Sequence, residues 1–152
     1  GMVKLYPLQY LAEHFIKFGC EFIVCDFRGY GRSDGNPTLR LALIDASAIY
    51  YYLRDNKLLK NIVCAMGRSL GSAPAIEFAF VSLNHMRVIE SGYADPIPLV
   101  ARRGLHISKL TDEENELFNN SDKIRLIKCP ILIMHGEDDS LISPREAKLN
   151  YK

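Results

Sequence analysis

Hydrophobic positions along the chain change period several times, from the three- and four-residue spacing of helices to the unbroken apolar runs of buried strands. Helical patterns predict helices at residues 5–18, 37–55, 73–80 and 144–152. Short β-rich apolar runs predict strands at residues 21–27, 61–66, 86–91 and 130–135. Unbroken apolar strands separated by helices indicate an α/β protein, with a mostly parallel sheet that carries helices on both faces.

The segment between the third and fourth predicted strands, residues 92–129, contains helical pieces and the polar turn FNNSDK. A chain of 152 residues has the length of one typical domain, so we interpret residues 1–152 as a single domain and residues 93–128 as a short lid on it. Asn36 and Pro37 are predicted to supply the N-cap and the first-turn proline of the second helix.

The sequence Gly-Arg-Ser-Leu-Gly at residues 67–71 stands between the second predicted strand and the helix that follows it. In a parallel sheet, functional groups gather in the loops at the carboxyl ends of the strands. On so sharp a turn Gly67 and Gly71 would avoid clashes, and the hydroxyl of Ser69 would stand clear of the sheet. The backbone N–H of Leu70 would then form half of an oxyanion hole. A serine that only caps a turn also fits the bare pattern, but the flanking strand and helix favour a nucleophile.

Further motifs follow in an order typical of one superfamily. The loop DFRGYGRSDGNP comes with the first predicted strand, ESGYAD with the third, and HGEDDSLISP with the fourth. Together with the GRSLG turn, this arrangement resembles the α/β-hydrolase superfamily over essentially the whole chain, and the first loop is similar to that of small esterase-like and thioesterase-like members. The resemblance implies a partial α/β-hydrolase fold in which Ser69 is the nucleophile and Asp139, matching the last residue of H-G-x-x-D, orients a catalytic histidine.

The chemistry of a serine nucleophile explains the need for such an acid. A serine hydroxyl is a poor nucleophile near neutral pH, so a histidine must take its proton. A carboxylate fixes the tautomer of that histidine and stabilises the imidazolium that forms. Asp139 could instead be a simple turn residue. Its neighbour Asp138 would take the role if the register were shifted by one, and Asp95, just after the third strand, is a further alternative.

The catalytic histidine is the main departure from the superfamily pattern. There it follows the acid after one more strand, whereas no histidine follows Asp139 in this chain. His14 lies in the first predicted helix, His85 before the third strand, and His135 matches the structural histidine of H-G-x-x-D. His106, in the predicted lid, is the one alternative left open as a base. We therefore expect no catalytic histidine within residues 1–152.

The resemblance also implies two or three strands before residue 1, the last followed by a loop that supplies the second oxyanion N–H. We therefore expect a piece of a hydrolase. In the superfamily's strand order, the absent strand lies between residues 21–26 and 61–66. An empty slot of about 9.6 Å, twice the normal strand spacing, would leave buried backbone groups unpaired. We expect direct pairing of these two segments, a strand donated by another chain in a homo-oligomer, or upstream residues that fill the slot.

Three functions fit these observations. The favoured one is a serine hydrolase that cleaves a carboxylic ester, thioester or amide of a small-molecule or acyl substrate through an acyl-enzyme on Ser69. The alternative is a non-catalytic binding protein of the same fold or an inactive fragment, because no histidine follows the acid. A nucleotide-binding domain is the third, but the glycines of residues 29–35 lack the G-x-G-x-x-G spacing that opens a helix. Without its base, the 152-residue chain alone is expected to be nearly inactive.

The overall composition argues against nucleic-acid binding, a membrane span and a metal or cofactor site. Nineteen basic residues balance eighteen acidic ones, so net charge indicates no nucleic-acid partner. No apolar run approaches the roughly 20 residues that a membrane span needs, and residues 1–10 lack a signal-peptide pattern. Four cysteines lie far apart without a CxxC pair, so we predict reduced core thiols in a cytoplasmic protein with neither a metal site nor a cofactor. They are Cys20, Cys25, Cys64 and Cys129.

Overall fold

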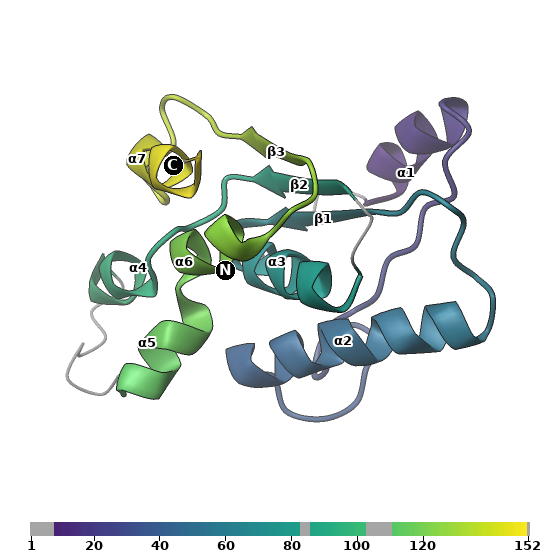
Figure 1. Cartoon of the computed structure of the whole chain (residues 1–152), viewed down its shortest axis with the longest axis horizontal. Coiled ribbons are helices and arrows are strands. Elements are labelled where there is room, and N and C mark those ends of the chain that lie inside the picture. The colour runs from purple at the N-terminus through teal and green to yellow at the C-terminus, as the bar shows by residue number, and fades with distance from the viewer. Residues whose placement is uncertain (1–7, 83–85, 103–110, 152) are drawn as a thin grey trace.

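The computed structural model of the chain describes residues 8–82, 86–102 and 111–151. In chain order its elements are α1 (Leu8–Lys17), α2 (Leu39–Asp55), β1 (Cys64–Arg68), the 3-10 turn η1 (Ser69–Gly71), α3 (Ser72–Val81), β2 (Met86–Glu90), α4 (Pro96–Arg102), α5 (Asp112–Phe118), α6 (Asn120–Leu126), β3 (Ile131–Met134) and α7 (Pro144–Tyr151) (Figure 1). Strands and helices alternate from β1 onward, which confirms the α/β class.

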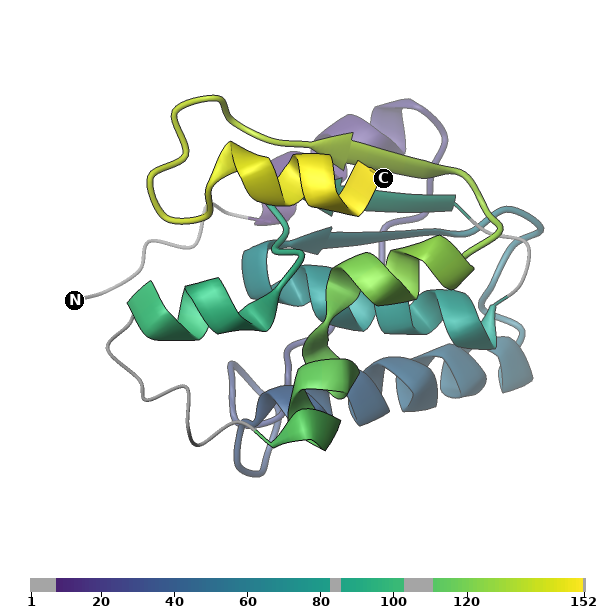
Figure 2. The same cartoon turned by 60° about the vertical axis from the view of Figure 1, so that its left-hand side comes forward.

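The three described strands form one parallel sheet in the order β1-β2-β3. Gly67 of β1 lies opposite Ile89 of β2, which in turn lies opposite Ile133 of β3. Parallel neighbours need long crossover connections, and these carry α3 and α6. In both views α3 and α6 lie below the strands, whereas α1 lies at the height of β2 and β3, beside them in Figure 1 and behind them in Figure 2.

The core lies between the sheet and the helices below it. One cluster joins α3, β2 and α6 through Ala75, Ile76, Ile89 and Ile124. A second cluster joins α2, α3 and α5 to the segments that follow β2 and β3, through Leu43, Ala73, Tyr93, Phe118 and Ile142. Both clusters contain residues of α3, which is why that helix is built of small and apolar residues on nearly every side.

The opposite face of the sheet is open near β3. Ile131 and Ile133 pack against the core cluster, and because side chains alternate along a strand, Leu132 and Met134 point the other way. Leu132 is 55% exposed and Met134 is 38% exposed. These two side chains are therefore left largely uncovered on that face.

Residues 21–27 do not form the predicted strand, and this prediction is wrong for the described structure. An apolar run becomes a strand only when a neighbour accepts and donates its backbone hydrogen bonds. Among the described residues β1 pairs with β2 alone, so the expected direct pairing of 21–26 with 61–66 is also absent there. Ile23 and Val24 are about half exposed as a result.

The remaining predicted elements are present with shifted ends. The second strand covers Cys64–Arg68 rather than residues 61–66, because Gly67 and Arg68 still pair with β2 although the apolar run has ended. Thr38, not Asn36, caps α2, and its hydroxyl accepts a hydrogen bond of 3.1 Å from the N–H of Leu41. Asn36 precedes a proline, which restricts its backbone, so the helix begins later than predicted.

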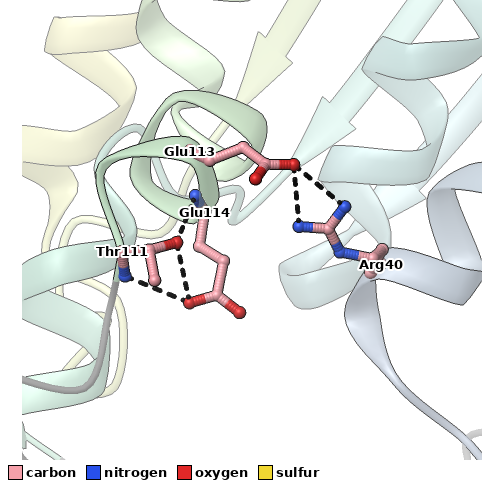
Figure 3. Close-up of polar contacts among 4 residues, drawn as sticks. All are labelled: Arg40, Thr111, Glu113 and Glu114. Carbon is pink, nitrogen blue, oxygen red and sulfur yellow. Dashed lines mark hydrogen bonds and ion pairs between the residues drawn. The ribbon is translucent and has the colours of Figure 1, made fainter.

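Helix α5 is fixed by a capping box and by an ion pair to α2 (Figure 3). The hydroxyl of Thr111 accepts from the N–H of Glu114 at 3.1 Å, and the Glu114 carboxylate accepts from the N–H of Thr111 at 3.1 Å. On the other side of α5, both terminal nitrogens of Arg40 donate to Glu113 at 3.3 Å. α5 thereby joins the first turn of α2, while the lid role of residues 93–128 stays a prediction.

The four cysteines are free, but they are not the core thiols predicted from the sequence. Three of them, Cys20, Cys25 and Cys64, are exposed, and Cys129 is half-buried. Cys20 and Cys25 lie on the segment after α1, Cys64 begins β1, and Cys129 lies two residues before β3. The cytoplasmic location inferred from them stays a prediction. Among the described residues, no helix has both the length and the apolar character needed to cross a membrane.

Candidate active site

Ser69 occupies a strained turn between β1 and α3. Its φ is +54°, in the left-handed region that residues other than glycine rarely adopt. The residue before it is extended, with φ −114° and ψ 135°, and the 3-10 turn and α3 follow directly. The sharp strand-to-helix turn that the sequence predicts at Ser69 is therefore present, and its torsions are unfavourable. Such strain persists only where the surrounding structure enforces it, and it clusters at functional sites.

The two glycines of the turn have different reasons to be glycine. A Cβ on Gly67 would overlap the carbonyl oxygen of Gly71 and lie 2.7 Å from the Cβ of Ala75. Gly67 thus lets β1 approach the first turn of α3. Gly71 has φ −66°, and a Cβ on it would meet nothing within 4 Å. The prediction that a side chain would clash is therefore right for Gly67 and wrong for Gly71. The backbone of Gly71 is close to Gly67, but a side chain on Gly71 itself would have room.

The start of α3 orients the peptide group that follows Ser69. The hydroxyl of Ser72 donates a hydrogen bond of 2.6 Å to the carbonyl oxygen of Ser69. The N–H groups of a first helical turn lack acceptors within the helix, and they favour bound anions. Leu70 is the second residue of η1, so its N–H belongs to this turn. That placement is what an oxyanion donor next to Ser69 requires.

Asp139 lies in the loop after β3, and its carboxylate organises that loop. Its Oδ1 accepts from the N–H of Ile142 at 2.9 Å and from the N–H of Leu141 at 3.0 Å. These backbone donors, Ile142 first, hold the pKa of Asp139 below its ordinary value, and the Ser91 hydroxyl and His135 act in the same direction. Asp139 is therefore ionised near neutral pH, at the same carboxyl edge of the sheet as Ser69.

His135 stabilises the same loop. Its side chain is 5% exposed, and its Nε2 lies 2.8 Å from the carbonyl oxygen of Ile142. A carbonyl can only accept, so Nε2 carries the proton. The same nitrogen lies 3.6 Å from Oδ2 of Asp139. A buried histidine with this partner ties the ends of the loop together, as the structural role predicted for it requires.

The alternatives for acid and base are placed as follows. Asp95 caps α4, since its Oδ1 accepts from the N–H of Ile97 at 2.9 Å. Asp138 is exposed. His14 lies on α1, with its Nδ1 2.8 Å from the carbonyl oxygen of Tyr10. His85 and His106 lie outside the described residues. Within the described part of the chain, no histidine bridges Ser69 and Asp139.

A mostly apolar cavity of about 140 Å³ lies beside the start of α3. Its lining includes Phe27, Tyr30, Leu39, Ala42, Leu70 and Pro74. It adjoins the turn through Leu70, the residue after Ser69, and it extends over the loop before α2. A carbonyl group held at Ser69 would thus have an apolar space next to it.

The glycine-rich loop at this cavity is held by its own residues. A Cβ on Gly31, whose φ is +55°, would overlap the carboxylate of Asp26. That carboxylate accepts from the N–H of Arg32 at 3.2 Å. Arg28 donates from two nitrogens to both carboxylate oxygens of Asp45 on α2. The loop's glycines therefore serve its internal packing, which gives no support to a nucleotide site.

Two residues that contact Ser69 or Asp139 were missed in the sequence. Ser72 contacts the Ser69 carbonyl, and Ser91, which also has a positive φ of +46°, lies beside Asp139. No motif signals either, because their roles depend on neighbours distant in the chain. The described residues contain no group of three or more histidine, cysteine, aspartate or glutamate side chains arranged to hold a metal ion.

Comparison with known proteins finds relatives of one kind. No family model matches the chain. It is 28% identical over 130 residues to alpha/beta hydrolase domain-containing protein 17B of Homo sapiens, covering 83% of the chain and 42% of that protein. It is 30% identical over 135 residues to protein bem46 of Schizosaccharomyces pombe, covering 83% and 44%. A putative alpha/beta hydrolase of Acanthamoeba polyphaga mimivirus, L404, is 28% identical over 149 residues, covering 94% and 53%. The chain thus spans about half or less of each relative.

Proposed function

Because the chain belongs to the α/β-hydrolase superfamily, we propose that Ser69 is the nucleophile of a serine hydrolase that cleaves a carboxylic ester, thioester or amide. The observation that carries the proposal is the positive φ of Ser69 at a turn between a parallel strand and a helix. Strain of this kind lifts a nucleophile above the carboxyl edge of the sheet. A serine that merely capped α3 would have ordinary extended torsions.

In the proposed mechanism the Ser69 hydroxyl attacks the substrate carbonyl, and a base takes the hydroxyl proton. The carbonyl oxygen becomes an oxyanion, which the N–H of Leu70 stabilises at the start of α3. The leaving group departs with the proton from the base, and an acyl-enzyme forms on Ser69. Water, activated by the same base, then releases the acid product and restores the serine.

Asp139 is proposed to orient that base. Its lowered pKa keeps the carboxylate charged, which is the form that fixes a histidine tautomer and stabilises the imidazolium. His135 is already bonded to the Ile142 carbonyl, and we propose that the base comes from the part of the hydrolase that extends beyond residues 1–152. Two of the relatives, the human protein and bem46, are each more than twice as long as the segment that they share with this chain.

The cavity beside Leu70 is proposed to receive the acyl part of the substrate. Ligand sites are concave and mostly apolar, with a few polar groups that set orientation. The cavity of about 140 Å³ meets this description and adjoins the proposed oxyanion donor. An apolar acyl group would therefore occupy it while the carbonyl reaches Ser69.

A fluorophosphonate probe tests the proposal, because it reacts with serines that a base has activated. The natural full-length protein is expected to be labelled rapidly at Ser69, and the 152-residue chain slowly or not at all. Ser69→Ala in the full-length protein should abolish labelling and reduce ester hydrolysis by a factor on the order of 10³ or more. Ser47→Ala is the control, since Ser47 lies within α2, outside the Ser69 turn and the loop that carries Asp139.

Each other outcome has a definite meaning. A full-length protein that is unlabelled at Ser69 would support the alternative, a non-catalytic binding protein of this fold. Rapid labelling of the 152-residue chain would mean that a histidine within it acts as the base. His106→Ala in that chain would then identify the histidine or exclude it.

A further inference from the structure

Residues 92–94, in the segment after β2, are buried, and side chains of other elements bind their backbone. Tyr93 is 1% exposed and Ala94 is fully buried. The carbonyl oxygen of Tyr93 accepts from the side-chain amides of Asn120 on α6 at 2.9 Å and Asn150 on α7 at 3.1 Å. The N–H of Ala94 donates to the carboxylate of Glu146, also on α7, at 2.9 Å. Two helices therefore satisfy the backbone of this segment.

One of these side chains also reaches the turn at Ser69. The amide nitrogen of Asn120 lies 3.3 Å from the hydroxyl oxygen of Ser72 and donates to it. That hydroxyl donates in turn to the carbonyl oxygen of Ser69 at 2.6 Å. Asn120 and Ser72 are both completely buried. A Cβ on Gly92 would lie 2.9 Å from the Cβ of Ser72, so the packing leaves Ser72 little freedom to move.

A hydrogen bond to the Ser69 carbonyl also fixes the direction of the next N–H. A peptide group is planar and trans, so its C=O and N–H point in opposite directions and turn together. The peptide that carries the Ser69 carbonyl also carries the N–H of Leu70. Holding that carbonyl at Ser72 therefore aims the N–H of Leu70, and Asn120 holds the hydroxyl that does so.

We propose that Asn120 is a positioning residue, which acts through Ser72 on the peptide group between Ser69 and Leu70. The inference rests on the proposed function of Ser69. An oxyanion donor acts most strongly on the charge that develops in the transition state. Loss of Asn120 therefore lowers kcat and leaves KM nearly unchanged, beyond any effect on folding.

The chain provides a matched control in Asn150. Asn120 and Asn150 both donate to the Tyr93 carbonyl, both are at most 2% exposed, and the side-chain oxygen of each has no partner within the described residues. Only Asn120 contacts Ser72. A purely structural role predicts the same consequences for both, whereas a positioning role separates them.

The experiment measures p-nitrophenyl butyrate hydrolysis and thermal unfolding in the natural full-length protein. Asn120→Ala and Asn150→Ala should lower the unfolding temperature by similar amounts. Asn120→Ala should also lower kcat by about three- to tenfold at constant KM, the size expected for one hydrogen bond, while Asn150→Ala should change kcat by less than about twofold. In a Ser72→Ala background, Asn120→Ala should give no further loss of kcat, because both changes break the same connection.

Equal kcat losses in Asn120→Ala and Asn150→Ala, or an unchanged kcat in Asn120→Ala, would overturn the positioning role. Where Asn120→Ala does not fold, Ser72→Ala decides, since it removes one oxygen atom and must still lower kcat at constant KM. Ser69→Ala separates the two proposals. If it retains activity, or if Ser69 takes up no fluorophosphonate, the proposed function fails and the inference fails with it. If it is inactive and the Asn120 variant behaves as wild type, only the inference fails.

Discussion

Replacing each glycine of the Ser69 turn by alanine should have opposite effects. In Gly67→Ala the new methyl group overlaps the Gly71 carbonyl oxygen and lies 2.7 Å from the Ala75 Cβ. The obstacle is backbone and a buried helix residue, not the end of a flexible side chain, so β1 or α3 must shift. Overpacking of this kind costs about 1–3 kcal/mol. The φ of Gly67 is outside the left-handed region, so the clash alone produces the cost.

Gly71→Ala is the matched variant, four residues further along the same turn. Its Cβ meets nothing within 4 Å, and its φ of −66° suits alanine. The substitution restricts the unfolded chain without straining the folded one, so it should stabilise the protein by about 0.4–1 kcal/mol.

Thermal unfolding followed by far-ultraviolet circular dichroism measures both changes. For a chain of this size, 1 kcal/mol corresponds to about 2–4 °C in Tm. Gly67→Ala should therefore lower Tm by roughly 2 to 12 °C and Gly71→Ala should raise it by roughly 1 to 4 °C. Equal destabilisation by both, or a Gly67→Ala protein as stable as wild type, would refute the steric reasoning.

Other substitutions test the loops and caps that surround the site. Asp139→Ala should cost about 1.5–3 kcal/mol at pH 7, because it removes a charged acceptor of two backbone N–H groups. The folded-state pKa of Asp139 is lowered, so the contribution of this carboxylate to stability is present above the unfolded pKa of about 3.9 and is lost as pH falls through the folded value. Urea unfolding at pH 7 and pH 3 should therefore show that the stability difference between Asp139→Ala and wild type closes in acid. Thr111→Ala should weaken α5 by about 0.5–2 kcal/mol, seen as faster hydrogen exchange of its amides, and unchanged exchange would exclude the cap. Gly31→Ala should destabilise more than Gly19→Ala in urea, because both have positive φ but only Gly31 has a neighbour in the way; equal losses would mean that backbone strain alone matters.

The parts of the fold that the sequence predicts well are those in which a local pattern and its tertiary partner coincide. The third and fourth apolar runs become β2 and β3 nearly as predicted, since each has a neighbouring strand to pair with. Residues 21–27 have an equally strand-like pattern and no such neighbour, so they remain irregular. Hydrophobicity identifies segments that can be strands, but pairing decides which of them are.

The candidate site likewise contains features that the local sequence predicts and features that depend on distant contacts. Ser69 is visible in the sequence because a strained turn between a strand and a helix demands a local motif, and its torsion agrees with that demand. The contact from Asn120 to Ser72 joins residues 48 positions apart, and no spacing rule links them. The difference between Gly67 and Gly71 is equally invisible, because it depends on which atoms of α3 come to face β1.

The open side of β3 also affects how experiments on residues 1–152 must be read. Leu132 and Met134 are exposed in the folded chain, and exposed apolar side chains bind hydrophobic fluorescent dyes. Dye fluorescence, usually a signal of unfolding, would therefore be high before any heating begins. A dye-based melting scan would report loss of a native binding surface together with exposure of the core, whereas circular dichroism follows the backbone alone.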